Sequence, residues 1–177
     1  MKRCLLIIIL VILCFDLCGC GANEESQYDE TTNQQISFQG INFQVPDEWE
    51  KPDVKFEDYN LAFAEWPKEA ASPINALMLT FESDTNLAET LEDREYAIEM
   101  GEDQGVHLQN YKQINKTIET MDAISIEYSR EIKGQTYEYR ELLLEVDKGV
   151  ISMIFSSTNP EGLKDFTKVV NSIRADH

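Results

Sequence analysis

The stretch ISFQGINFQVP, residues 36–46, decides how the folded part of this chain begins. Apolar residues alternate with polar ones on both sides of Gly40, and Pro46 closes the second run. An alternation with a period of two is typical of a strand with one buried face, and a glycine between two such runs permits a tight turn. The sequence therefore predicts a small β-hairpin at the start of a domain.

The residues of this hairpin and the Trp that follows it carry a family resemblance. They resemble the PsbP-like family, which includes the DcrB-like bacterial envelope lipoproteins, at Gly40, Phe43, Val45, Pro46 and Trp49. In that family a short hairpin runs into a strand that ends in Val-Pro or Ile-Pro, and a Trp comes next. The resemblance covers about residues 36 to 175 at the level of the fold. It implies a single PsbP-like α/β/α sandwich over residues 36–177 and the role of a non-enzymatic accessory protein.

The chain upstream of the hairpin begins with a pattern typical of export. Lys2 and Arg3 precede eleven apolar residues in a row, Leu5 to Phe15. A positive start, a short apolar stretch and small residues before a cleavage point describe a secretory signal peptide, here residues 1–19. A transmembrane helix needs about 20 apolar residues, so the stretch is short for one, although an uncleaved anchor stays open as the alternative.

The end of that segment, Leu17-Cys18-Gly19-Cys20, resembles the lipobox of bacterial lipoproteins. The resemblance implies cleavage before Cys20, a diacylglyceryl group on the Cys20 sulfur, and attachment to the cell membrane on its extracytoplasmic face. Asp16 departs from the apolar pattern that precedes a lipobox. Residues 20–35 are polar and acidic and have too little apolar surface to fold, so we expect the lipidated Cys to be followed by a flexible tether.

The composition narrows the range of partners. The chain has 15 basic and 33 acidic residues, and without residues 1–19 it keeps 13 and 32, a net charge of −19. Such a charge excludes nucleic acid, which binds Lys- and Arg-rich surfaces, and it opposes flat adhesion to anionic headgroups. It favours a basic partner, divalent cations or simple solubility. No cysteine lies beyond Cys20, so the domain depends on a hydrophobic core and has no internal disulfide.

Strands and a first helix are predicted between the hairpin and residue 105. Short strands are expected at 54–56 and 61–66, and a strand buried on both faces at 74–82. Asn86 with Glu89 three residues later is a capping-box pattern, and the helix is expected to end near Gly101. Residues 84–103 hold eight acidic residues and one basic residue. This run favours a solvated outer face, with a docking face for a basic partner or a loose cation site as the alternative.

An antiparallel meander is predicted next. Strands are expected at 111–118 and 123–132, and on both sides of a turn at 147–149, ending at 157. A two-residue loop at Lys133-Gly134 sets the register between two of them. This register pairs residues that suit adjacent antiparallel strands: Glu127 with Arg140, Tyr128 with Tyr139, and Arg130 with Tyr137.

A last helix completes the expected fold. Asn159-Pro160 is expected to open it, as the cap and the first helical residue. Apolar residues at helical spacing from Leu163 to Ile173 form a stripe that packs on the sheet. The fold class is therefore α+β: a PsbP-like α/β/α sandwich, with a largely antiparallel sheet, an N-terminal hairpin and two main helices.

The sequence offers few groups for catalysis, and no catalytic, cofactor or metal site is predicted. His107 and His177 are the two histidines, and His177 is the last residue. The sequence contains no nucleophile elbow and no phosphate-binding loop. The candidate site is a possible interaction patch on the meander hairpin, formed by Tyr128, Arg130, Tyr137 and Tyr139. Tyr and Arg are common at the centres of interfaces, and the alternative is a sheet surface covered by a helix or a tail.

Two functions are expected from these observations. The first is a non-enzymatic lipoprotein, held to the membrane by the lipid on Cys20, whose domain docks onto a protein partner in the cell envelope. The alternative is a lipoprotein that binds a small ligand or a cation in a pocket beside the sheet. A deep pocket with convergent polar groups favours the alternative, and a flat patch favours docking.

Overall fold

The computed structural model describes residues 33–52, 59–66, 73–103, 105–159 and 161–176. The predicted strand at 54–56 and the lipid-attachment residue Cys20 lie outside these ranges. In chain order the elements are β1 (Asn33–Phe38), β2 (Ile41–Pro46), β3 (Leu61–Glu65), β4 (Asn75–Ser83), α2 (Leu87–Asp103), β5 (Gln109–Ile118), β6 (Met121–Ile132), β7 (Gln135–Val146), β8 (Gly149–Ser157), α3 (Gly162–Asn171) and β9 (Arg174–Ala175).

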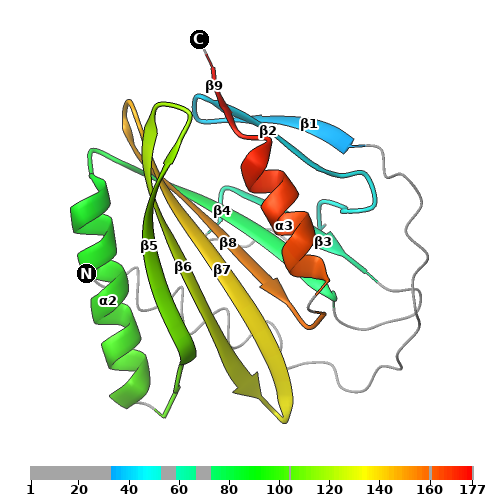
Figure 1. Ribbon diagram of the computed structural model, residues 1–177, viewed down its shortest axis with the longest axis vertical. Coiled ribbons are helices and arrows are strands. Elements are labelled where there is room, and N and C mark those ends of the chain that lie inside the picture. Colours follow the sequence, from blue (N-terminus) through cyan, green and yellow to red (C-terminus); the bar gives the residue numbers. More distant parts are fainter. Residues whose placement is uncertain (1–32, 53–58, 67–72, 104, 160, 177) are drawn as a thin grey trace.

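Two sheets are formed by these strands. The larger has six strands in the order β3-β4-β8-β7-β6-β5, and each neighbouring pair is antiparallel. The smaller has the order β1-β2-β9, so the C-terminal strand joins the N-terminal hairpin. Figure 1 shows α2 and α3 on opposite sides of the larger sheet, with the small sheet beyond one end of α3. The expected largely antiparallel sheet with an N-terminal hairpin and two main helices is confirmed.

The hairpin forms as the alternation predicts. Phe38 pairs with Ile41 across a turn that contains Gly40, whose φ is +84°. The side chains of Phe43, Val45 and Trp49 are buried. The first strand starts at Asn33, because the last three residues of the expected tether, 33–35, pair with β2.

One face of the large sheet carries the main core. The hairpin and α3 lie on this face, where Trp49 of the loop after β2 and Phe166 of α3 meet β8. The ring of Phe155 stacks on Trp49 with centroids 5.6 Å apart, and on Phe166 with centroids 5.1 Å apart. Aromatic side chains bury large areas, so these stacked rings join three separate elements into one core.

The opposite face of the sheet is covered in part by α2. Leu87 and Leu91 of the helix pack on a buried cluster from three strands, made up of Ile124, Ile126, Leu143 and Val150. Successive residues of β7 therefore face opposite cores, since Leu142 and Leu144 belong to the α3 side and Leu143 to the α2 side. This alternation of buried side chains explains the unbroken apolar run in the sequence.

The register of the meander agrees with the prediction. β6 and β7 pair as expected from a two-residue loop, with Glu127 opposite Arg140, Tyr128 opposite Tyr139 and Arg130 opposite Tyr137. The loop residues Lys133 and Gly134 both have positive φ, +52° and +79°. Two successive residues with positive φ are the signature of the hairpin turn that fits twisted strands.

The predicted opening of the last helix is wrong. α3 begins at Gly162, and Glu161 precedes it without a side-chain cap. Asn159 forms a turn of its own, because its Oδ1 accepts a hydrogen bond from the Glu161 N–H (3.0 Å) and its carbonyl accepts one from the Gly162 N–H (2.9 Å). An Asn that bonds to the backbone two residues later stabilises a turn as well as it caps a helix.

The predicted end of the first helix is also wrong. α2 continues past Gly101 to Asp103. The Val106 N–H bonds to the Gly101 carbonyl and the Gly105 N–H to the Glu102 carbonyl, both at 2.9 Å. This pair of bonds, with Gly105 at φ +82°, is a Schellman motif. The glycine that ends the helix is therefore Gly105.

At the start of α2, the predicted cap is confirmed, since Asn86 Oδ1 accepts hydrogen bonds from the N–H groups of residues 88 and 89.

Candidate functional site

The predicted interaction patch lies on the α2 face of the large sheet. Tyr128 and Arg130 come from β6, and Tyr137 and Tyr139 from β7. Residues two apart on a strand share a face, and the confirmed register brings the two pairs together. We call these four residues the aromatic–arginine cluster.

The cluster is closely packed. The rings of Tyr128 and Tyr139 stack with centroids 4.9 Å apart and an interplanar angle of 10°. Tyr137 lies 6.5 Å from Tyr139 at a tilt of 37°. The guanidinium carbon of Arg130 is 5.9 Å from the centre of the Tyr139 ring, a cation–π contact.

Most of the cluster is buried. Tyr139 is 1% exposed and Arg130 is 7% exposed, while Tyr128 and Tyr137 are half-buried. Tyr139 also packs with Met78 of β4 and Ile154 of β8. None of the four side chains is fully exposed, so the cluster is a partly buried layer and not a flat exposed patch. Whether this layer meets a partner stays a prediction.

A polar chain extends from the cluster to α2. The Tyr128 hydroxyl donates a hydrogen bond to Glu141 Oε1 at 2.8 Å, and Arg94 Nε lies 3.0 Å from Glu141 Oε2. The side chains of Arg94 and Glu141 are 10% and 3% exposed, so this ion pair is buried. Sequence reasoning did not single out either residue. The available signals were a lone basic residue in an acidic helix and a Glu on the same strand face as Tyr139 and Leu143.

Burial shifts the acidity of the tyrosines in the cluster. It raises the pKa of Tyr139 to about 12, and the nearby Arg130 opposes this shift. The pKa of Tyr128 is raised well above its usual value by burial and then by the charge of Glu141. Burial also raises the pKa of Tyr137. All three hydroxyls are therefore neutral at physiological pH.

A cavity of about 30 Å³, partly open to solvent, lies between the cluster and the C-terminal half of α2. Its polar lining consists of Arg94, Tyr128, Arg130 and Glu141. Its apolar lining consists of Ala97, Ile98, Gly101, Val106, Leu108 and Ile154. The lining of the cavity thus combines apolar side chains with convergent polar groups.

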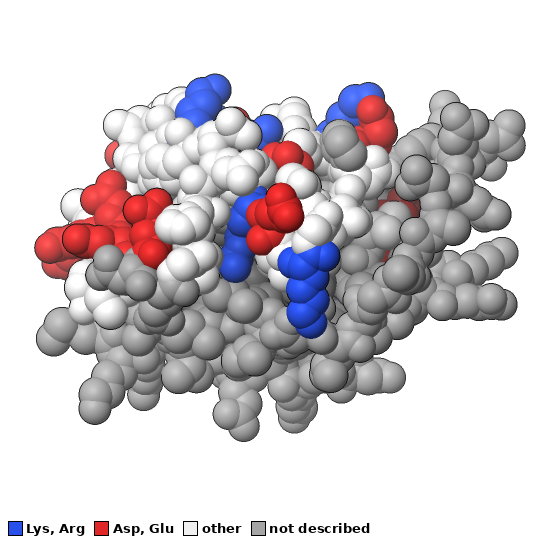
Figure 2. Space-filling model, turned by 90° about the horizontal axis from the view of Figure 1, so that it is seen from below, with Lys and Arg blue, Asp and Glu red and all other residues white. Residues whose placement is uncertain are grey.

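The exposed face of α2 is acidic. Figure 2 shows Asp and Glu side chains gathered at the left of the molecule, where α2 ends. The helix exposes several carboxylates, and Arg94 turns inward to Glu141. The exposed acidic side chains are Glu89, Glu92, Asp93, Glu95, Glu99 and Glu102. This distribution agrees with a solvated outer face over a thin apolar stripe.

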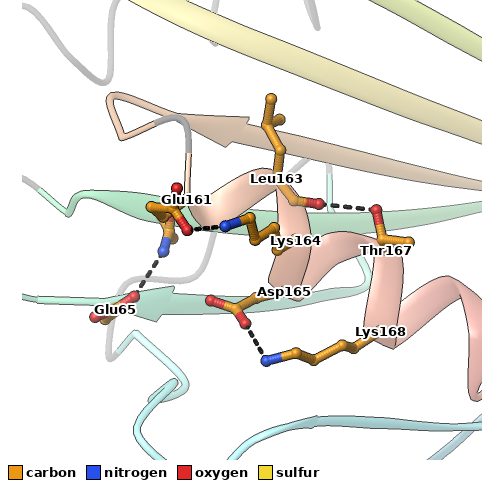
Figure 3. A network of polar contacts seen from close by, with 8 residues as sticks. Glu65, Glu161, Leu163, Lys164, Asp165, Thr167 and Lys168 are labelled. Carbon is orange, nitrogen blue, oxygen red and sulfur yellow. Dashed lines mark hydrogen bonds and ion pairs between the residues drawn. The ribbon is translucent and has the colours of Figure 1, made fainter. Parts of the chain in front are cut away.

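A second polar network surrounds the first turn of α3, on the other side of the sheet (Figure 3). Asp165 is 4% exposed and forms an ion pair with Lys168 at 2.9 Å. Glu65 at the end of β3 accepts a hydrogen bond from Asn75 at 2.6 Å. Burial raises the pKa of Glu65, and the bond from Asn75 opposes this shift. Both carboxylates have partners: the ion pair of Asp165 lies within α3, and the hydrogen bond of Glu65 joins β3 to β4.

No metal centre is apparent in the described part of the chain, where no three His, Cys, Asp or Glu side chains are grouped to hold an ion. Among the same residues, no helix combines the length and the apolar character that crossing a bilayer requires.

Comparisons with known proteins identify solved structures with a similar fold. No family model matches the sequence, and no curated protein matches it. The solution structure of the cyanobacterial PsbP protein CyanoP from Synechocystis sp. PCC 6803 is similar over 90% of this chain and 98% of its own, with 14% identity and a TM-score of 0.62. The crystal structure of LpqN, which is involved in cell envelope biogenesis of Mycobacterium tuberculosis, is similar over 84% of this chain and 93% of its own, with 11% identity and a TM-score of 0.55.

Similarity at these identities concerns the fold alone. The shared architecture is a largely antiparallel sheet between two helices, and it extends over most of both chains. This protein therefore has a PsbP-like fold, as the residues from Gly40 to Trp49 indicated.

Proposed function

We propose that this protein is a membrane-anchored extracytoplasmic lipoprotein whose PsbP-like domain is a non-enzymatic docking module of the cell envelope. The observation that carries the proposal is the order of two features along the chain. A lipobox-like Leu17-Cys18-Gly19-Cys20 follows a short apolar stretch, and a PsbP-like domain comes after it. The acyl chains on Cys20 would supply the membrane affinity, at about 0.8 kcal/mol per buried methylene.

The comparisons support the cell envelope as the location of this protein. LpqN, which shares the fold, is involved in cell envelope biogenesis. The short segment between Cys20 and β1 would hold the domain near the headgroups, and the negative charge of the chain would keep the domain from adhering to anionic lipid. A docking role for the domain also agrees with the absence of catalytic motifs from the sequence.

Replacing the anchor residue tests the proposal. Cys20→Ser removes the sulfur that carries the lipid, so the precursor should keep its signal peptide or the product should lose its acyl mass. Cell fractionation with intact-mass spectrometry measures both outcomes. Cys18→Ser is the matched control, because it changes the neighbouring cysteine and leaves the modified one in place. Membrane sedimentation and mass identical to those of the unchanged chain in the Cys20→Ser variant would disprove the anchor.

The docking role is tested by crosslinking in native membranes followed by mass spectrometry. We expect one envelope protein to be captured by the wild-type chain and to be lost when Cys20→Ser releases the domain. Capture that is equal in both variants would show that the anchor plays no part in docking.

The alternative function, binding of a small ligand, has one structural observation in its favour. The cavity beside the aromatic–arginine cluster contains a buried guanidinium, that of Arg130, with an unsatisfied Nε.

A further inference from the structure

Arg130 is a buried cation without a counter-ion in the described part of the chain. It is 7% exposed, and its Nε atom has no hydrogen-bond partner. Its guanidinium lies over the Tyr139 ring. A cation–π contact is weak compared with the hydration that a buried charge gives up, so buried guanidinium groups are normally paired with an acid. Arg130 therefore leaves one positive charge unneutralised on the wall of the cavity.

The other charges that face the cavity cancel each other. Arg94 and Glu141 form an ion pair at 3.0 Å, and Tyr128 donates to the same carboxylate. The net charge of the lining is therefore +1, in a chain whose overall charge is −18. A monoanion would neutralise this site. A dianion would leave an extra negative charge beside Glu141, which is unfavourable in a buried place.

The other lining residues and the volume of the cavity indicate the polarity and size of the rest of the ligand. The rest of the lining is formed by apolar side chains that include Ile98, Leu108 and Ile154. The enclosed volume, about 30 Å³, holds two or three water molecules, since one needs about 10–15 Å³ in this measure. A group the size of a carboxylate fits this volume, and a longer apolar body must lie along the open side against the apolar wall.

We propose that this cavity binds a small monocarboxylate with an apolar body, whose carboxylate accepts hydrogen bonds from the Arg130 guanidinium. Arg and carboxylate match in geometry, because the planar fork of N–H groups can meet two oxygens at once. The apolar body lies against Ile98 and Ile154. The proposal deepens the ligand-binding alternative and rests on it, but it does not depend on the lipid anchor.

The test uses three probes with the intact chain, purified in a neutral detergent. Hexanoate supplies the carboxylate and a short apolar body, hexan-1-ol supplies the same body without charge, and hexyl phosphate supplies a second negative charge. Isothermal titration calorimetry, with detergent alone as the blank, measures binding of each. We expect hexanoate to bind at least tenfold more tightly than either other probe. Equal affinity for hexanoate and hexan-1-ol would overturn the proposal, and so would tighter binding of hexyl phosphate.

Two arginine variants locate the site. Arg130→Gln removes the charge and keeps a polar amide on a shorter side chain, and we expect it to weaken hexanoate binding at least tenfold. Arg140→Gln is the matched control, because Arg140 lies on β7 and pairs with Glu127 on the opposite face of the sheet. It should bind hexanoate as the wild type does. Equal binding by wild type and Arg130→Gln would overturn the proposal, as would a loss confined to Arg140→Gln.

A third variant covers the case in which Arg130→Gln fails to fold. Ile98→Trp places a larger side chain at the half-buried rim of the cavity on α2. It should abolish hexanoate binding while circular dichroism shows the wild-type helix content. Unchanged binding by folded Ile98→Trp would overturn the proposal. The fractionation of Cys20→Ser is a separate measurement, so failure of the anchor and failure of this site are distinguishable.

Discussion

Tyr128 and Tyr139 stack on each other across the β6–β7 pair, yet their hydroxyl groups have different surroundings. The Tyr128 hydroxyl donates to Glu141, whereas the buried Tyr139 hydroxyl has no hydrogen-bond partner among the described residues. Removing a hydrogen bond to a charged group costs about 1.5–3 kcal/mol, but removing an unsatisfied buried hydroxyl costs little and can stabilise. We therefore expect Tyr128→Phe to lower the free energy of unfolding by about 2 kcal/mol and Tyr139→Phe to leave it unchanged or raise it.

Urea unfolding at pH 7 compares these two variants directly. Each variant keeps its aromatic ring, so ring stacking is retained in both and the change in side-chain volume is the same. Each variant is therefore the control for the other. An equal loss of stability in both would show that the hydroxyl partners do not decide the difference.

The Tyr139 hydroxyl also predicts how stability depends on alkaline pH. Burial raises its pKa to about 12 in the folded protein, from about 10 for an exposed tyrosine. The folded state then holds a proton that the unfolded state has lost, so this contribution is fully present below pH 10 and disappears as pH rises towards 12. We expect Tyr139→Phe to flatten the fall in unfolding free energy between pH 9 and about 11.

Urea unfolding at a series of pH values checks this slope. Tyr96→Phe is the control, because it removes a tyrosine hydroxyl from a side chain that is 53% exposed. A slope in Tyr139→Phe that matches the wild type would contradict the assignment of the shift to this residue.

At the scale of single elements, local sequence patterns predicted the pairing of strands better than they predicted where the helices begin and end. The loop at Lys133-Gly134 fixed the β6–β7 register because a two-residue hairpin turn allows one alignment of its strands. The start of α3 was missed because Asn159 can cap a helix or form a turn with the same side chain. The buried Arg94–Glu141 pair was missed for a different reason. It depends on how α2 lies on the sheet, which no local pattern specifies.

The contact at the start of α3 gives a prediction about an element end. A Cβ built on Gly162 would lie 2.6 Å from Ser157 Oγ and closer still to Asn75 Oδ1. Both neighbours are buried and bonded, Ser157 to Asn159 and Asn75 to Glu65. Overpacking at such a position costs about 1–3 kcal/mol, so Gly162→Ala should lower the midpoint of thermal unfolding by several degrees.

A second glycine serves as the matched control for Gly162. Gly101 lies inside α2, and a Cβ built on it would meet Val106 at 3.7 Å, an ordinary contact. Alanine is favoured over glycine in a helix interior by up to about 1 kcal/mol. Gly101→Ala should therefore leave the midpoint unchanged or raise it, and a larger loss there than in Gly162→Ala would contradict the packing argument.

At the scale of the whole molecule, the fold separates two kinds of surface. The α3 side buries the main hydrophobic core, and the α2 side presents the acidic face of the helix to solvent. The carboxylates on the outer face of α2 are therefore exposed to solvent. The fold is shared with the similar structures, while the acidic outer face of α2 and the buried Arg130, whose Nε has no hydrogen-bond partner among the described residues, depend on the residues of this chain.

The net charge of −18 predicts that salt stabilises the protein. Like charges repel more strongly in the compact state than in the unfolded chain. Raising the ionic strength from about 10 mM to 150 mM shortens the screening length from about 30 Å to about 8 Å, which is less than the span of α2. We expect the midpoint of thermal unfolding to rise by about 2–4 °C in NaCl, which corresponds to about 1 kcal/mol for a chain of this size.

Calcium chloride at the same ionic strength is the control, because screening alone gives an equal rise in the midpoint, whereas a cation site on the acidic face of α2 gives a larger rise. A midpoint that falls with NaCl would mean that the ion pairs, such as Arg94–Glu141, outweigh the repulsion among the exposed carboxylates.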